Sequence, residues 1–91
     1  MTVSVKFFAY FRDIFGARVL DLDLEACSTV GGLLERLCDS SERRREVFAG
    51  PELKSHLVVM VNGVHHLSLS GLRTPLSDGD TVAIFPFLAG G

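Results

Sequence analysis

The residues of this chain that point most directly to chemistry are its last four, residues 88–91, which end in Gly90-Gly91. They follow residues 81–85, a β-branched and aromatic run that predicts a strand, and an Asp-Gly-Asp turn signal at residues 78–80. Pro86 has no backbone N–H, so regular strand pairing is expected to weaken there. A strand that carries a bare glycine carboxylate beyond the fold would present that carboxylate to another protein. The alternative is a frayed glycine tail with no chemical role.

Two other groups of side chains suggest a metal or catalytic site at first sight. His65 and His66 are adjacent, and adjacent strand residues point to opposite faces, so surface histidines are expected rather than a shared ion. Asp78 and Asp80 are better explained as turn residues that hydrogen-bond the backbone than as catalytic carboxylates. The sequence shows no nucleophile paired with a base. We therefore expect a carrier or co-substrate rather than a complete enzyme, with no metal and no bound cofactor.

Size and composition narrow the class of protein. The 91 residues fit one domain, and the 47% apolar content excludes disorder. A net charge of -2 argues against nucleic-acid binding, and the arginines at residues 43–45 are flanked by glutamates, which favours a solvated polar face. Neither a signal peptide nor a run of ~20 apolar residues is present, so we expect a soluble, cytoplasmic protein without a membrane partner. Cys27 and Cys38 lack metal-type spacing and are expected to fill the core.

The elements that must position the tail begin with a predicted hairpin and a helix. Residues 2–10 alternate in polarity and predict a strand, and residues 18–24 predict a second strand after a turn at Gly16. Ser28 or Thr29 then caps a helix that ends around residues 39–41. The buried stripe of this helix has helical spacing and consists of Val30, Leu33, Leu34, Leu37 and Cys38.

The second half of the chain predicts a short helix and two further strands. Residues 42–52 are charged and favour a short helix that ends at Gly50-Pro51. Residues 56–62 form an apolar strand, Asn62-Gly63 is a hairpin-type turn, and residues 64–67 form a short edge strand. An irregular connection over residues 68–75 follows. The leucines expected to point inward from this part of the chain are Leu69, Leu72 and Leu76.

This order of elements predicts the fold. A hairpin, a crossing helix, a strand, a short strand and a final strand, with the first and last strands parallel at the centre, make an α+β β-grasp. We expect a mixed sheet of four to five strands with one main helix packed on one face. Residues 1–91 form a single domain, and the tail at residues 87–91 leaves from a central strand.

The sheet is predicted to have a second apolar face. If Val82 and Ile84 face the helix, alternation places Phe85 on the other face, beside Phe8. Contiguous exposed apolar groups on a small domain indicate a partner-binding surface. The alternative is a satellite core under loops. The residues predicted to form this partner-binding surface are Phe8, Met60, Phe85 and Phe87.

Three segments of the chain resemble a known family. The N-terminal VKFFAYFRDIFG, the central VVMVNG and the terminal PLSDGDTVAIFPFLAGG are similar to the ubiquitin-like sulfur carriers of the MoaD/ThiS family, in order over nearly the full chain. The Asp-Gly-Asp turn with the terminal Gly-Gly is the most specific part. The small subunit of molybdopterin synthase commonly ends this strand in Pro-Pro, whereas here Phe87 follows Pro86.

The resemblance implies a sulfur-transfer function for the C-terminal carboxylate of Gly91. A ubiquitin-activating-type adenylyltransferase (MoeB/ThiF-like) would adenylate it with ATP, and a sulfur donor such as a persulfide protein would convert it to a thiocarboxylate. Sulfur would then pass to molybdopterin (for a molybdenum or tungsten cofactor) with a MoaE-like larger subunit as partner. The alternatives are thiamine thiazole synthesis or another thiolation pathway, a protein modifier joined to lysines through Gly91, and a non-covalent β-grasp interaction module.

The small residues of the tail suit this chemistry. A tail that threads a narrow channel needs its carboxyl carbon close to the attacking atom. Gly90 and Gly91 lack Cβ, so they adopt whatever φ the channel requires. Ala89 is small for the same reason, and Leu88 is expected to anchor the tail at the channel mouth.

Overall fold

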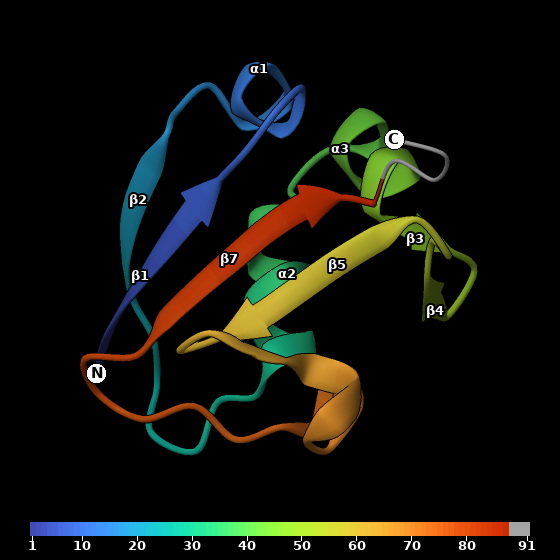
Figure 1. Cartoon of the computed structure of the whole chain (residues 1–91). Helices are drawn as coiled ribbons and strands as arrows, with labels where there is room; N and C mark the ends of the chain where they lie inside the picture. The colour runs from blue at the N-terminus through green and yellow to red at the C-terminus, as the bar shows by residue number, and fades with distance from the viewer. Residues whose placement is uncertain (88–91) are drawn as a thin grey trace.

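A computed structural model of the chain describes residues 1–87 as one sheet packed on helices (Figure 1). The strands of this sheet lie in the order β2-β1-β7-β5-β6, and β3 pairs with β4 in a separate hairpin. The elements in chain order are β1 (Thr2–Phe7), α1 (Phe11–Phe15), β2 (Val19–Asp23), α2 (Val30–Leu37), α3 (Ser41–Val47), β3 (Phe48–Ala49), β4 (Glu52–Leu53), β5 (Leu57–Val61), β6 (Val64–His65), the 3-10 helices η1 (His66–Ser68) and η2 (Gly71–Arg73), and β7 (Thr81–Pro86).

The pairing at the centre of the sheet is that of a β-grasp. β1 pairs antiparallel with β2 and parallel with β7, while β7 pairs antiparallel with β5. The first and last strands therefore lie side by side at the centre, as the order of elements predicted (Figure 1). The ubiquitin-like β-grasp fold expected from the sequence is confirmed.

The core lies between the sheet and α2. One face of the three central strands is closed to solvent, and its fully buried residues are Val3, Val5, Phe7, Val59, Val82 and Ile84. The stripe of α2 covers this face, because Val30, Leu33 and Leu34 are all buried. Thr29 caps the helix by accepting a hydrogen bond from the Gly32 amide at 3.2 Å. The predicted cap and stripe are confirmed, but the helix ends at Leu37 and not around residues 39–41 as predicted.

Gly31 lets the start of α2 pack closely against the chain before β7. A Cβ at Gly31 would lie 3.1 Å from the carbonyl oxygen of Leu72 in η2. That distance is tighter than an ordinary contact, so a larger residue would push η2 away.

The first strand is shorter than predicted. β1 ends at Phe7, and Ala9 has a φ of 54°, which ends the extended backbone before residues 9–10 can join the strand. The short helix α1 follows, which the alternation over residues 2–10 did not predict. Phe11 and Phe15 are buried one helical turn apart, and this burial holds α1 against the core.

Other parts of the connections also differ from the prediction. Cys27 is exposed at a φ of 68°, so it does not fill the core, whereas Cys38 is buried. Leu69 is 44% exposed and does not point inward, while Leu76 is buried and Leu72 is partly buried against the core. The charged segment after α2 forms α3 and then the β3-β4 hairpin, with Gly50 at a φ of 66° in the turn. None of the helices in residues 1–87 has the length and apolarity needed to cross a membrane.

Candidate functional site

The site is built on the end of β7, the central strand that leads to the C-terminus. β7 is paired along both edges, with β1 on one side and β5 on the other, and Pro86 lies opposite Leu57 in the register. Phe87 follows the strand and is 62% exposed. The predicted reactive carboxylate of Gly91 and the predicted threading residues Leu88, Ala89 and Gly90 lie outside the described residues. The base from which these residues start is a strand held on both sides.

The Asp-Gly-Asp turn anchors the other end of β7. Asp78 accepts a hydrogen bond from the Thr2 amide at 2.7 Å, and Asp80 accepts one from the Ser77 amide at 2.8 Å. The second oxygen of Asp80 accepts from the Asn62 side chain at 2.9 Å. Gly79 has a φ of 86°, a backbone conformation that favours glycine. Both aspartates therefore serve the turn, as predicted, and tie β7 to its two neighbours.

Part of the open face of the sheet is apolar. Because side chains alternate along β7, Ala83 and Phe85 lie on the face of the sheet that does not carry the covered residues Val82 and Ile84. Met60 of β5 is the cross-strand partner of Ala83. Phe8 packs edge-on against Phe85, with ring centroids 6.0 Å apart. The four side chains that we call the apolar patch are Phe8, Met60, Ala83 and Phe85.

The apolar patch is accessible to a partner. Phe8 is 39% exposed, and Met60, Ala83 and Phe85 are each partly exposed. These values and the exposure of Phe87 argue against the alternative of a satellite core. The structure thus brings Phe8, Met60 and Phe85 together as expected from the sequence, and it places Phe87 directly beyond the strand.

A cation and a polar region border the apolar patch. The guanidinium carbon of Arg12 lies 5.6 Å from the centroid of the Phe8 ring, and its Nε donates to the Phe7 carbonyl at 3.0 Å. At the other end of the face, the Ser4 hydroxyl donates to Asp21 at 2.6 Å. The open face is therefore apolar near the end of β7 and polar near its start.

Tyr10 and His56 flank the end of β7. The Tyr10 hydroxyl and the Nε2 of His56 lie 2.8 Å apart, and the His56 carbonyl accepts a hydrogen bond from the Phe87 amide at 2.6 Å. Burial and then the negative charge of Glu46 raise the pKa of Tyr10, so its hydroxyl keeps its proton at neutral pH. Sequence reasoning missed Tyr10 and His56 because they meet across 46 positions of the sequence. It missed Arg12 because α1 begins at Phe11 and brings this side chain back to Phe7 and Phe8.

The two adjacent histidines differ from the prediction of surface residues on opposite faces. β6 ends at His65 and η1 begins at His66, so the rings stack at a centroid distance of 4.9 Å instead of pointing apart. His66 is buried, and its Nδ1 lies 3.0 Å from the Val59 carbonyl oxygen. Burial lowers the pKa of His66 despite that hydrogen bond, with a smaller contribution from His65. Among residues 1–87, no cluster of three or more metal-ligating side chains is present.

The buried cysteine has no features of a nucleophile. Burial raises the pKa of the Cys38 thiol to about 11, and this effect outweighs the lowering by Arg44. The protonated thiol is a poor nucleophile at neutral pH. Cys38 is therefore a core residue.

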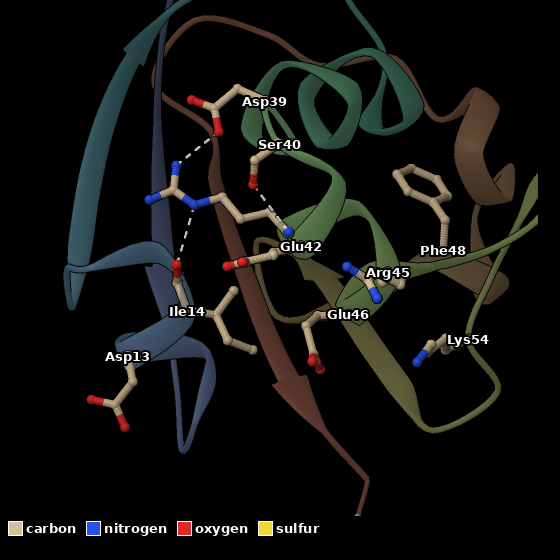
Figure 2. A pocket seen from close by; sticks show the side chains of 10 residues that line it. Asp13, Ile14, Asp39, Ser40, Glu42, Arg45, Glu46, Phe48 and Lys54 are labelled. Carbon is tan, nitrogen blue, oxygen red and sulfur yellow. Dashed lines mark hydrogen bonds and ion pairs between the residues drawn. The ribbon is translucent and has the colours of Figure 1, made fainter.

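A hollow with a volume of about 940 Å³ lies between α1 and α3 (Figure 2). Its walls carry charges of both signs. Arg43 spans it by donating to Asp39 at 3.0 Å and to the Ile14 carbonyl at 3.2 Å, which ties the two helices together. The hollow contains none of the residues predicted to act in the function.

Comparisons with known proteins agree with this geometry. The family model described as the ThiS family matches residues 5–91. The small archaeal modifier protein 3 of Haloferax volcanii is 35% identical over 96 residues, covering 100% of both chains. The solution structure of the Haloferax volcanii HVO 2177 protein has a TM-score of 0.85 and 34% identity, over 100% of this chain and 87% of that chain. A putative molybdopterin converting factor, subunit 1, from Pyrococcus furiosus has a TM-score of 0.78 and 28% identity, over 97% of this chain and 99% of that chain.

Proposed function

The chain belongs to the ThiS family of ubiquitin-like sulfur carriers and modifiers, and we propose that it carries sulfur as a thiocarboxylate on Gly91 for molybdopterin synthesis in the cytoplasm. One observation supports this proposal most strongly. β7 is paired along both edges and ends beside the apolar patch, at the exposed Phe87, only four residues before the terminal glycine. A rigid base, a docking surface and a short glycine-ended tail together suit the delivery of a carboxylate into another protein.

The chemistry begins with activation of the Gly91 carboxylate by an ATP-using adenylyltransferase of the MoeB/ThiF type. A carboxylate oxygen attacks the α-phosphorus of ATP, pyrophosphate leaves, and an acyl adenylate forms. A persulfide sulfur then attacks the carboxyl carbon and AMP leaves, which gives an acyl disulfide. A thiol reduces the S–S bond, is itself oxidised to a disulfide, and releases the thiocarboxylate. The ionised sulfur is then the nucleophile that attacks the acceptor.

We propose that this chain binds its partners and presents its C-terminal carboxylate to them, since the apolar patch lies beside the end of β7. The apolar patch gives a partner a contact surface near the end of β7, and Arg12 at its edge adds a cation. We propose that the adenylyltransferase and a MoaE-like larger subunit bind this surface in turn. The same patch would orient the tail toward each active site.

One observation favours the molybdopterin pathway over other thiolation pathways. The similar Pyrococcus structure carries the name of a putative molybdopterin converting factor, subunit 1. Thiamine thiazole synthesis would use the same carrier chemistry with a different acceptor.

A second candidate function is protein modification. The relative at 35% identity is named a small archaeal modifier protein. The acyl adenylate is the shared intermediate, since a lysine amine that displaces the activated carboxylate yields an isopeptide bond instead of a thiocarboxylate. The two functions therefore differ only after activation of Gly91.

Intact-mass spectrometry tests the proposal. The chain is incubated with the activating enzyme, ATP and a persulfide donor, and then with a MoaE-like subunit captured in a pull-down. Exchange of one C-terminal oxygen for sulfur, followed by sulfur loss to a molybdopterin precursor, is the expected result. A partner protein whose mass rises by that of this chain less one water, without sulfur exchange, would support the modifier instead. An unchanged mass of the chain would favour a non-covalent interaction module.

A further inference from the structure

The hydrogen bond between Tyr10 and His56 spans the end of the strand that carries the tail. Tyr10 follows the end of β1, and His56 precedes the start of β5, while β7 lies between these two strands in the sheet (Figure 1). The hydroxyl and Nε2 are 2.8 Å apart, and the two residues are separated by 46 positions in the sequence. The side-chain contact therefore connects the strands on either side of β7 at the point where β7 ends.

His56 also holds the backbone of the residue that follows β7. Its carbonyl accepts the Phe87 amide at 2.6 Å, which extends the antiparallel register beyond the Leu57–Pro86 pair. Pro86 has no N–H and cannot supply a bond of its own at this position. The Phe87 amide therefore holds the first residue after β7 to the backbone of His56.

Tyr10 is itself held in place. Its ring packs on Phe11 with centroids 4.6 Å apart, and Phe11 is fully buried at the start of α1. The hydroxyl is protonated and available for the contact with His56 at neutral pH. Tyr10 therefore sets the position of the His56 ring, and the backbone carbonyl of His56 in turn holds Phe87.

We infer that Tyr10 and His56 form a clasp across the end of β7 that sets the direction in which the reactive tail leaves the sheet. This inference rests on the proposed function of Gly91. Tyr10 and His56 are positioning residues, because they act on the tail through the backbone of Phe87. Four residues can span at most about 14 Å, so a change of direction at their base displaces the terminal carboxylate by several ångströms.

Loss of the clasp is expected to change KM rather than kcat. If the tail can leave the sheet in several directions, only a fraction of the molecules hold it in the direction that allows docking. The apparent affinity for the activating enzyme falls in proportion to that fraction. Once docked, the carboxylate reacts as before. We expect KM for the activating enzyme to rise about three- to tenfold, with kcat within about twofold of its original value.

The test uses Tyr10→Phe, which keeps the ring on Phe11 and removes only the hydroxyl, with His56→Ala and the double variant. Two quantities are measured for the full chain: amide hydrogen exchange at Phe87 relative to the core amide of Ile84, and the steady-state kinetics of C-terminal adenylation with ATP. Ser28→Ala is the matched control, because it removes the hydrogen bond from Ser28 to the Glu25 carbonyl. These residues follow the end of β2, which pairs with the start of β1 and so lies at the opposite end of the sheet.

In Tyr10→Phe we expect faster amide exchange at Phe87 but not at Ile84, together with the rise in KM. The double variant should show no further change. Ser28→Ala should show neither effect. Unchanged Phe87 exchange, or equal acceleration at Phe87 and Ile84, would overturn it. Faster Phe87 exchange with an unchanged KM would overturn it as well. If the unaltered chain is never adenylated, the proposed function fails, and Phe87 exchange still decides whether the clasp exists.

Discussion

The two faces of the central sheet are built from alternating residues of the same strands, yet they serve different purposes. On the covered face, Val82 and Ile84 of β7 are fully buried beneath α2. On the open face, Phe85 of the same strand is partly exposed and packs against Phe8, which is 39% exposed. On a chain of 91 residues, an aromatic pair exposed to water adds less to stability than the covered residues do. It gives a partner protein an apolar surface to contact. Stability and recognition are therefore separated by the two-residue period of the strand.

The largest expected effect concerns stability and the covered face. Ile84→Ala removes a fully buried side chain from the central strand and should lower the free energy of unfolding by about 2–5 kcal/mol. Phe8→Ala removes a larger side chain from the open face and should cost only about 1 kcal/mol through its edge-on contact with Phe85. Urea denaturation of both variants measures the difference. Similar losses in the two variants would contradict the separation of the faces.

The second prediction concerns binding by the open face. Phe8→Asp places a charge in the apolar patch and should raise the dissociation constant for the activating enzyme by at least about tenfold. The free energy of unfolding should fall by only about 1 kcal/mol. Isothermal titration calorimetry measures the dissociation constant, and urea denaturation measures the free energy of unfolding.

Leu67→Asp is the control for this binding experiment. Leu67 is 73% exposed but lies in η1, outside the apolar patch, so the same change in charge should leave the dissociation constant unaltered. Equal weakening by the two aspartates would show that net charge, rather than the patch, controls binding.

A smaller effect is expected from the helix that covers the core face. Thr29→Ala removes the cap at the start of α2 and should lower the free energy of unfolding by about 1 kcal/mol. Thr29→Ser keeps the capping oxygen and is the matched control. Thermal unfolding of the two variants measures how much the cap contributes to stability. The dissociation constant for the activating enzyme should be the same in both. A change in binding would mean that the two faces are coupled through α2.

The last prediction concerns a pH effect on stability at His66. Burial lowers the pKa of His66 in the folded chain below its ordinary value of 6.5, so the unfolded chain takes up the proton first as the pH falls. The stabilisation is fully present above pH 6.5 and is lost as the pH falls toward the folded-state pKa. Urea denaturation between neutral and mildly acidic pH should show a decline that is shallower in His66→Gln. Identical pH profiles would mean that His66 does not titrate differently on folding.

Much of the fold could be predicted from the sequence because its signals are local. The alternation of β7 correctly placed Ile84 on the covered face and Phe85 on the open face, and the stripe of α2 was predicted from its spacing. The turn aspartates were also interpreted correctly. Each of these features depends on residues a few positions apart.

The features that were missed depend on tertiary contacts or on one unusual backbone angle. The positive φ of Ala9 ends β1 early and allows α1 to form, although the alternation continues to Tyr10. His66 is buried because η1 turns it away from the line of β6. The contact between Tyr10 and His56 joins residues 46 positions apart, which no local pattern reveals.

The central claim is that this scaffold presents the carboxylate of Gly91 for charging with sulfur. The most direct test is intact-mass spectrometry of the unaltered chain and of Gly91→Ala after incubation with the activating enzyme, ATP and a persulfide donor. We predict that the unaltered chain exchanges one C-terminal oxygen for sulfur, while Gly91→Ala, with the same free energy of unfolding, does not. Equal sulfur incorporation by both chains, or none by the unaltered chain, would contradict the account.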